Sequence, residues 1–441
     1  MKSSEVLKIC REESVRFLRL QFTDILGCNK NVEVPEGQFE KALDGQIMFD
    51  GSSIEGFSRI EESDMLLSPD PATFRIFPWE QMRRGKVARL ICDVSLPDGS
   101  VFQGCPRSRL KAVIEQARQE GYVLRSGSEV EFFLFQRNER GEPTTRTHDA
   151  GGYFDLTPVD RGEEARRDIV TTLQAMGFEV EAAHHEVAPG QHEIDFRHEE
   201  ALTAADNIAT FRLVVRKVAQ DHGLHATFMP KPIREAAGSG LHIHQSLQRD
   251  GVNAFFDPSA DNGLSPVALS YIAGQLSHAR GLCAVTNPLV NSYKRLVRGY
   301  EAPTSVAWSE RNRSPLIRVP ARRGEGTRCE YRCPDPSCNP YLALAALLRV
   351  GLQGIEEDLK PPPPVNRNIY RMSVRQRRKH KIEDLPRNLD QALTYLKRDK
   401  LVQSALGSHI YKNFMEAKKQ EWRLFCEQVH PWEVDTYLGL Y

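Results

Sequence analysis

Paired carboxylates recur in this sequence in patterns that could hold a divalent cation. Residues 128–135 read Ser-Glu-Val-Glu-Phe-Phe-Leu-Phe. This composition predicts a strand, and the strand period of two places Glu129 and Glu131 on one face. Two neighbouring carboxylates beside an apolar run are costly to bury unless a cation lies between them. A single pair of this kind is more often an exposed strand end, but the arrangement recurs along the chain.

Two further carboxylates, Glu186 and Glu193, lie on either side of a Pro-Gly turn at residues 189–190. A loop with such a turn can direct both side chains toward one point. A fifth carboxylate, Glu330, alternates with arginines in the segment 328–332, so that a carboxylate and a guanidinium share one face of a strand. These segments favour a site assembled from several parts of the chain.

The segment 241–247 alternates apolar and polar residues. His242, His244 and Ser246 therefore share one face of a predicted strand, while the leucines and the isoleucine share the other. A polar strand face with two imidazoles is more often a ligand or phosphate surface than part of a core, although two ordinary surface histidines remain the alternative.

Together these segments supply an oxygen-rich ligand set with one imidazole, which suits six-coordinate Mg²⁺ or Mn²⁺ better than zinc. Six ligands are too many for one ion that must also hold a substrate, so the set predicts two ions. Three nearby cysteines at 329, 333 and 338 have the wrong spacing for zinc and no fourth partner. The candidate ligands are Glu129, Glu131, Glu186, Glu193, His242 and Glu330.

Arginine is concentrated between residues 295 and 332, a segment that contains nine arginines and only four acidic residues. The forked guanidinium recognises carboxylate and phosphate oxygens, so metals beside such a cluster indicate phosphoryl transfer with a carboxylate co-substrate. No Gly-x4-Gly-Lys-Ser/Thr segment exists, which excludes a P-loop, and Gly238-Ser-Gly240 lacks the third glycine of a dinucleotide fingerprint. We expect these two glycines to let the backbone approach a substrate closely.

The elements that must position these residues alternate between strands and helices. Strands are expected in residues 16–34, as a pair joined by a turn, and at 87–94, 178–183 and 224–229, with a domain boundary near residue 100. Helices are expected from Pro106 to Gly121, at 160–176 and at 200–222. The prolines at 361–364 precede a mostly helical C-terminal region. The pattern is that of an α+β protein.

The composition excludes several functional classes. The chain has 441 residues, 40% apolar and 27% charged, with 59 basic and 59 acidic residues and no net charge. Neutrality argues against direct nucleic-acid binding, and no apolar run approaches the roughly 20 residues of a membrane span. Nine scattered cysteines suit reduced thiols. The N-terminus lacks a signal peptide, so a cytoplasmic location is expected.

Ordered motifs extend over nearly the whole chain: Phe49-Asp-Gly-Ser-Ser-Ile54, the Glu-x-Glu strand, the loop at 185–193, Gly238-Ser-Gly-x-His242, Gly299-Tyr-Glu-Ala-Pro303 and Asn312-Arg-Ser-Pro-Leu-Ile-Arg318. In these the sequence resembles glutamine synthetase, and within that family the bacterial type I alpha subclass, which is not adenylylated and is feedback-inhibited. The resemblance implies an α+β fold with two domains. A small β-grasp-like domain would occupy residues 1–100, and a catalytic domain with a curved antiparallel sheet flanked by helices would occupy residues 101–441.

The resemblance also implies roles for individual residues. Glu131, Glu186 and Glu193 would hold one Mg²⁺ or Mn²⁺, and Glu129, His242 and Glu330 the other. L-Glutamate would contact Gly238, Arg295, Glu301, Arg313 and Arg332, and ATP would contact Glu181, His244, Ser246, Arg313 and Arg318. The catalytic residues would be Asp50, Glu301 and Arg313. Arg59 matches a position associated with feedback inhibition by glutamine.

In this family Asp50 reaches the active site of a neighbouring subunit, where it binds ammonium and takes its proton. The resemblance therefore implies a homo-oligomer, a dodecamer of two stacked hexameric rings with shared active sites, and a possible transcription-factor partner. The sequence departs from the family at Ala237, where asparagine is common, at Arg298, where proline is common, and in a charged segment at 231–236. No segment around residues 368–384 matches the adenylylated tyrosine region.

Three functions are compatible with these motifs. The first is ATP-dependent ligation of ammonia to L-glutamate through γ-glutamyl phosphate. The second is a γ-glutamyl-polyamine or related ligase, against which the retained Asp50 and Glu301 argue. The third is a catalytically silent assembly or regulatory protein, against which the complete ligand and arginine sets argue.

Overall fold

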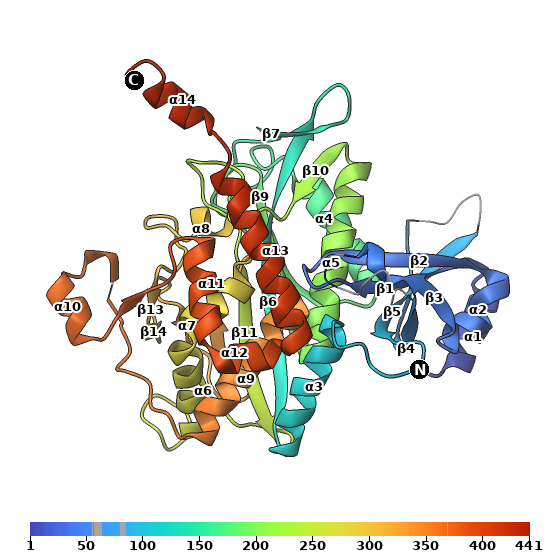
Figure 1. Ribbon diagram of the computed structural model, residues 1–441, viewed down its shortest axis with the longest axis horizontal. Helices are drawn as coiled ribbons and strands as arrows, with labels where there is room; N and C mark the ends of the chain where they lie inside the picture. The colour runs from blue at the N-terminus through green and yellow to red at the C-terminus, as the bar shows by residue number, and fades with distance from the viewer. Residues whose placement is uncertain (55, 57–63, 80–84, 368) are drawn as a thin grey trace.

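The computed structural model describes residues 1–54, 56, 64–79, 85–367 and 369–441. Arg59, the predicted regulatory residue, lies outside them. Figure 1 shows a smaller N-terminal part beside a larger part built around a long sheet. In the larger part, helices pack against the sheet, and α14 (Pro431–Tyr437) extends away from the body at the C-terminus. The α+β class and the two-part architecture agree with the sequence prediction.

The N-terminal part is a five-stranded sheet with the order β2-β1-β5-β4-β3. Its strands are β1 (Val15–Thr23), β2 (Asn29–Pro35), β3 (Ile47–Asp50), β4 (Asp64–Ile76) and β5 (Lys86–Ser95), and its helices are α1 (Ser3–Glu12) and α2 (Phe39–Leu43). Leu18, Leu20 and Phe22 alternate into the core along β1, because successive side chains of a strand face opposite sides. The predicted strand pair and the strand at 87–94 are confirmed.

The larger sheet has ten strands, with the order β14-β15-β16-β11-β6-β9-β8 along its main path. Most neighbours are antiparallel, and β14 and β15 are parallel. The main strands are β6 (Val123–Arg137), β8 (Val180–His185), β9 (Gln191–Glu200), β11 (Leu241–Arg249), β14 (Trp308–Ser309), β15 (Ile317–Arg318) and β16 (Cys329–Tyr331). Strands β7 (Pro143–Thr147) and β10 (Leu224–Thr227) pair with β6, and β12 (Val252–Asn253) pairs with β11. A separate pair joins β13 (Ser305–Val306) to β17 (Glu383–Asp384).

Helices cover this sheet and supply most of the core. The two longest buried helices are α5 (Ala201–Asp221) and α9 (Pro340–Glu356), and α9 is apolar on nearly all sides. The others are α3 (Pro106–Gln119), α4 (Glu163–Ala175), α6 (Pro266–Ser277), α7 (Ala279–Thr286), α8 (Ser292–Arg295), α10 (Val374–Lys379), α11 (Leu389–Arg398), α12 (Lys400–Leu406) and α13 (Ser408–Cys426). The predicted helices at 106–121, 160–176 and 200–222 are confirmed, with ends that differ by up to three residues.

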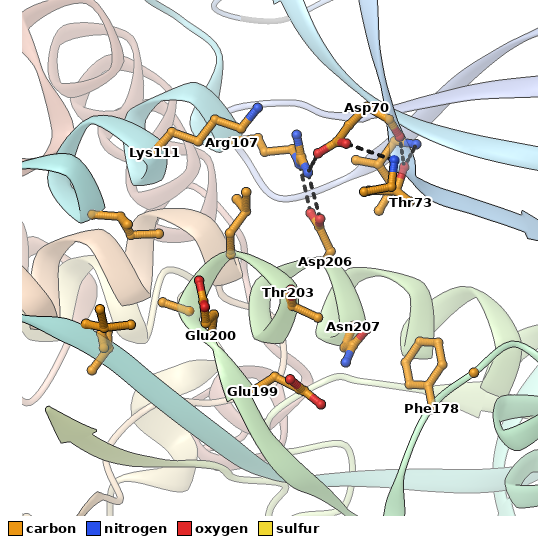
Figure 2. Close-up of a pocket in the computed structure, with 18 of the residues that line it drawn as sticks. Asp70, Thr73, Arg107, Lys111, Phe178, Glu199, Glu200, Thr203, Asp206 and Asn207 are labelled. Carbon is orange, nitrogen blue, oxygen red and sulfur yellow. Dashed lines mark hydrogen bonds and ion pairs between the residues drawn. The ribbon is translucent and has the colours of Figure 1, made fainter. Parts of the chain in front are cut away.

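A buried ion-pair network joins the two parts of the chain. Figure 2 shows Arg107 of α3 between Asp70 of β4 and Asp206 of α5. The Nη2 atom of Arg107 lies 2.7 Å from Asp70 Oδ2 and 2.8 Å from Asp206 Oδ2. These residues line a cavity of about 770 Å³ between the N-terminal sheet and α5. Because breaking such a buried pair leaves an uncompensated charge, the network fixes how the N-terminal sheet meets the larger part.

The nine cysteines are all free, and Cys329, Cys333 and Cys338 are buried. Cys333 Sγ donates to Asn287 Oδ1 at 3.0 Å, so this thiol has a protein partner. Among the helices of the described residues, we find none with the length and apolar character that crossing a bilayer requires.

Candidate active site

Strand register brings the predicted ligands onto one face of the large sheet. Antiparallel pairing places His242 of β11 opposite Glu129 of β6, and Glu131 of β6 opposite Glu193 of β9. Glu330 of β16 lies opposite His244, the next residue along the same face of β11. Residues directly opposite each other in a sheet share a face and lie close enough to interact. Carboxylates separated by as many as 201 residues in sequence, Glu129 and Glu330, therefore converge.

Glu129, His242 and Glu330 form the first cluster, and their ligand atoms all lie within 4.8 Å of one another. His242 Nδ1 is 2.8 Å from Glu129 Oε2 and 3.8 Å from Glu330 Oε1. His244 Nε2 donates to the second oxygen of Glu129 at 2.7 Å, while Arg328 Nε donates to His244 Nδ1 at 3.0 Å. The trio predicted from the sequence thus comes together around one point.

Histidine and arginine side chains hold the first cluster ionised. Burial alone raises the pKa of Glu129, but hydrogen bonds and charges from His242 and His244 outweigh burial and bring it below its usual range. Burial also raises the pKa of Glu330, which is completely buried. The Arg332 charge outweighs burial and lowers this pKa to about 2. Arg318 Nη1 lies 2.8 Å from Glu330 Oε2, and Arg332 pairs with Oε1.

The second cluster is built differently from the predicted trio. Glu131, Glu193 and His242 have ligand atoms within 4.8 Å of one another, whereas Glu186 lies outside this tighter group. Glu186 nevertheless lines the same cavity as Glu131 and Glu193. His184 connects the two acids of the loop, since its Nε2 lies 3.0 Å from Glu193 Oε1 and its Nδ1 lies 4.0 Å from Glu186 Oε1.

In the part of the chain that the structure describes, Glu131, Glu186 and Glu193 pair with histidines and with no arginine or lysine. Burial, together with the charges of Glu131 and Glu193, raises the pKa of Glu186 to about 8. Burial and the charge of Glu131 raise the pKa of Glu193 to about 10. Neighbouring carboxylates that cannot all ionise in a low-dielectric site are what a bound divalent cation relieves. The oxygen-rich donor set of the two clusters therefore fits hard divalent cations.

Two adjoining cavities contain most of the remaining predicted residues. The larger, of about 680 Å³, is lined by five of the six metal candidates, all except Glu330. It is also lined by Gly238, Arg295, Glu301, Arg313, Arg318 and Arg332. The smaller, of about 250 Å³, is lined by the predicted nucleotide residues Glu181, His244 and Ser246. Glu129 and Asp195 line both cavities. Arg313 and Arg318, expected at ATP, line the larger cavity.

Close contacts with Pro230 and Arg295 explain the two glycines at 238 and 240. A Cβ added to Gly238 would lie 2.3 Å from the Pro230 carbonyl oxygen, and one added to Gly240 would lie 2.5 Å from Arg295 Nη2. Arg295 is itself buried and donates to the carbonyl of Cys333 at 2.8 Å. The glycines are therefore required by close approach within the protein, in addition to any approach of a substrate.

Asp50 lies outside both cavities. It is exposed at the end of β3, and hydrogen bonds from Ser52 lower the pKa of its carboxyl group. Glu301 is exposed and lines the larger cavity, with a backbone φ of 58°, in the left-handed region that non-glycine residues seldom adopt. The single chain thus places Glu301 at the site and leaves Asp50 apart from it.

Sequence reasoning missed Gln191, Asp195 and Tyr153. The Gln191 amide donates to Glu131 Oε2 at 2.8 Å and to the Gly238 carbonyl at 3.2 Å. It therefore ties a metal candidate to the glycine segment. Asp195 faces Glu129 across the sheet, and Tyr153 lines the larger cavity near Arg313. The alternation of Gln191, Glu193 and Asp195 along β9 was a usable signal, whereas nothing in the sequence marks Tyr153.

Comparison with known proteins identifies relatives along the whole chain. The family model for the glutamine synthetase beta-Grasp domain matches residues 14–97, and that for the glutamine synthetase catalytic domain matches residues 103–437. The chain is 63% identical to glutamine synthetase of Thermus thermophilus over 99% of each chain. It is 56% identical to glutamine synthetase of Clostridium saccharobutylicum over 99% of this chain and 98% of that one.

Solved structures share the fold over nearly the whole chain. GmaS in complex with ADP superposes with a TM-score of 0.89 at 32% identity, over 98% of this chain and 99% of the other. Plasmodium falciparum glutamine synthetase superposes with a TM-score of 0.88 at 23% identity over 99% of each chain, a likeness of fold. With two family models together spanning most of its length, and identities of 56–63% to curated relatives, the chain belongs to the glutamine synthetase family.

Proposed function

We propose that this protein is a glutamine synthetase that ligates ammonia to L-glutamate at the expense of ATP, giving L-glutamine, ADP and phosphate. Its role would be nitrogen assimilation. The observation that carries the proposal is the convergence of both acidic clusters on His242, in a cavity that also contains the arginines. Family membership at high identity over the full chain supports it.

Two divalent cations per subunit, Mg²⁺ or Mn²⁺, fit the two clusters. Glu129, His242 and Glu330 would hold one, and Glu131, Glu186 and Glu193 the other. Bound there, the cations would neutralise phosphate charge and polarise the transferred phosphoryl group. The adjoining smaller cavity, with Glu181, His244 and Ser246, is the proposed nucleotide side, and the relative solved with ADP supports a nucleotide in this fold.

Different residues of this chain then bind glutamate and stabilise the transferred phosphoryl group. The oxygen of a carboxylate is a poor leaving group, so glutamate is first converted to γ-glutamyl phosphate. Gly238, Arg295 and Arg332 position glutamate, and Arg313 and Arg318 offset the charge that develops on the phosphoryl group. Preorganised guanidinium groups of this kind each contribute about 3 kcal/mol of transition-state stabilisation. Glu301, an exposed residue that lines the larger cavity, would close over the site and limit hydrolysis of the acyl phosphate.

Ammonium must be bound and lose a proton before it can attack. Asp50 and Glu301 would do this, because both are carboxylates and Asp50 is held ionised by Ser52. Since Asp50 lies outside the cavities of its own chain, we propose that it completes the site of a neighbouring subunit. This requires a homo-oligomer, and the arrangement that we propose is a dodecamer of two stacked hexameric rings.

Finer assignments follow from the resemblance. We place the chain in the bacterial type I alpha subclass, without control by adenylylation, with glutamine feedback through Arg59 and with a transcription factor as a possible partner. We also propose the division into residues 1–100 and 101–441, and a cytoplasmic location.

A steady-state assay tests the proposal. Phosphate release should require ATP, L-glutamate and ammonium together, with putrescine replacing ammonium poorly. Activity with putrescine alone would favour a γ-glutamyl-polyamine ligase. No turnover with either amine, in protein that binds ATP, would favour a silent scaffold.

A further inference from the structure

The loop segment of residues 186–193, which ends in the first three residues of β9 and carries Glu186 and Glu193, is anchored from outside the site by Asp149. This carboxylate is buried, and its Oδ1 atom accepts a hydrogen bond from the backbone N–H of Gly190 at 2.8 Å. Gly190 is the turn residue of the loop, with a φ of 69°. Its own carbonyl accepts from the N–H of Leu134 in β6 at 2.8 Å. The turn is therefore held on both sides of Gly190.

His185 extends the same anchor to the beginning of the loop. Its Nε2 atom lies 3.3 Å from Asp149 Oδ1, and its Nδ1 atom lies 2.7 Å from the carbonyl oxygen of Glu186. The ring is completely buried and is clamped between these two oxygens. Asp149 thus reaches both the first residue of the loop and its turn.

Asp149 is itself fixed by the body of the protein. Its Oδ2 atom lies 3.0 Å from His148 Nε2 and accepts from the N–H of Arg161 at 3.3 Å. The other nitrogen of His148 donates to the Leu134 carbonyl of β6 at 2.9 Å. The contacts form a continuous path from the central strand, through two side chains, to the loop.

An anchor on this side has a physical purpose. Glu186, Glu193 and Glu131 line one cavity, and the loop would separate these carboxyl groups if it moved outward. Contacts on the outer side oppose that movement and keep the carboxylates close before a cation arrives. Partners of this kind orient metal ligands and affect metal affinity strongly. We propose that Asp149 is a positioning residue that presets the loop 186–193 for cation binding, an inference that rests on the metal assignment under Proposed function.

A metal ion at the anchor itself is the competing interpretation. Asp149, Asp160, His185 and His192 have ligand atoms within 4.8 Å of one another. However, the Arg166 guanidinium lies 2.7 Å from Asp160 Oδ2 and 2.9 Å from His192 Nδ1. A fixed cation already compensates this cluster, so the structure favours positioning over a further metal site.

The test compares Asp149→Asn with Asp206→Asn in the full-length protein. Asparagine keeps the shape of Asp149 but cannot accept hydrogen bonds on both sides. Asp206 is the matched control, because it is another buried, ion-paired carboxylate and lines a separate cavity beside the N-terminal sheet. Mn²⁺ binding is followed by the electron paramagnetic resonance of free Mn²⁺. Exchange of the Gly190 amide is measured in metal-free protein.

We expect Asp149→Asn to weaken Mn²⁺ binding by about 10- to 100-fold and to speed exchange at Gly190, and Asp206→Asn to change neither. His185→Gln keeps the Asp149–Gly190 bond, so it should weaken Mn²⁺ binding and speed exchange at Gly190 by a smaller factor. This variant replaces Asp149→Asn in the test if Asp149→Asn does not fold. Wild-type Mn²⁺ affinity and exchange in both loop variants would overturn the inference, as would an equal loss in Asp206→Asn. Retained loop-site binding with loss of a third Mn²⁺ would indicate a metal at the anchor. If wild-type protein bound no Mn²⁺, the metal assignment itself would fail.

Discussion

Cation binding should release protons from the second acidic cluster. Without metal, Glu186 has a pKa of about 8 and Glu193 a pKa of about 10, because both are buried beside other carboxylates. Both therefore retain their protons at neutral pH, whereas metal ligation requires ionised carboxylates. Saturating the site should release roughly two protons per subunit at pH 7. At pH 9, where Glu186 is already ionised, roughly one should be released.

The same pKa shifts determine how the stability of the metal-free protein changes with pH. Both pKa values lie above the value of 4.5 for an ordinary glutamate, so these two residues bind more protons in the folded, metal-free protein than in the unfolded chain between about pH 4.5 and 10. Their contribution to stability should fall as pH rises through that range. A bound cation removes the repulsion, so the rise in melting temperature that Mg²⁺ produces should be larger at pH 8 than at pH 6.

Titration calorimetry measures the proton release directly. Mg²⁺ is titrated into metal-free protein at pH 7 in two buffers with different ionisation enthalpies, and the difference in observed enthalpy gives the number of protons. Glu193→Gln is the control, and its release should be lower by at least one proton, since glutamine has none to lose and no longer raises the pKa of Glu186. Equal enthalpies in both buffers would refute the account of the second cluster.

Three further predictions concern other parts of the site. Glu330→Ala should leave Arg332 buried without its partner and lower the free energy of unfolding by about 3–5 kcal/mol in chemical denaturation. It should also lower kcat about 10²–10³-fold. Wild-type turnover would show the ligand assignment to be wrong. Mixing Asp50→Ala chains with Glu330→Ala chains, then reassembling them, should restore about a quarter of wild-type activity if neighbours share sites; no recovery from correctly assembled mixtures would contradict sharing. Ala237→Asn should lower KM for glutamate about 2- to 10-fold, the effect of one added hydrogen bond, and an unchanged KM would place residue 237 away from glutamate.

Periodicity along single strands was enough to predict which side chains share a face. The alternation in β6 and β11 predicted that Glu129 lies with Glu131, and His242 with His244, and the register confirms that each pair faces the same side. This succeeds because a strand has a fixed period of two. The register between strands has no such local rule. The pairing of Glu131 with Glu193 depends on turns and packing far along the chain.

The residues that sequence reasoning missed act through tertiary contacts. Asp149 lies in a glycine-rich segment without periodicity, and its importance comes only from its contacts with Gly190 and His185. The glycine at 238 was interpreted as an approach to substrate, whereas packing against the Pro230 carbonyl already requires it. Such requirements are set by backbone segments that come together only in the folded state.

Anomalous diffraction from Mn²⁺-soaked crystals, recorded at the manganese edge, tests the central claim most directly. The account predicts two peaks per subunit, one among Glu129, His242 and Glu330 and the other among Glu131, Glu186 and Glu193. An absence of peaks in saturated crystals, or peaks only at the Asp149 and Asp160 cluster, would contradict it.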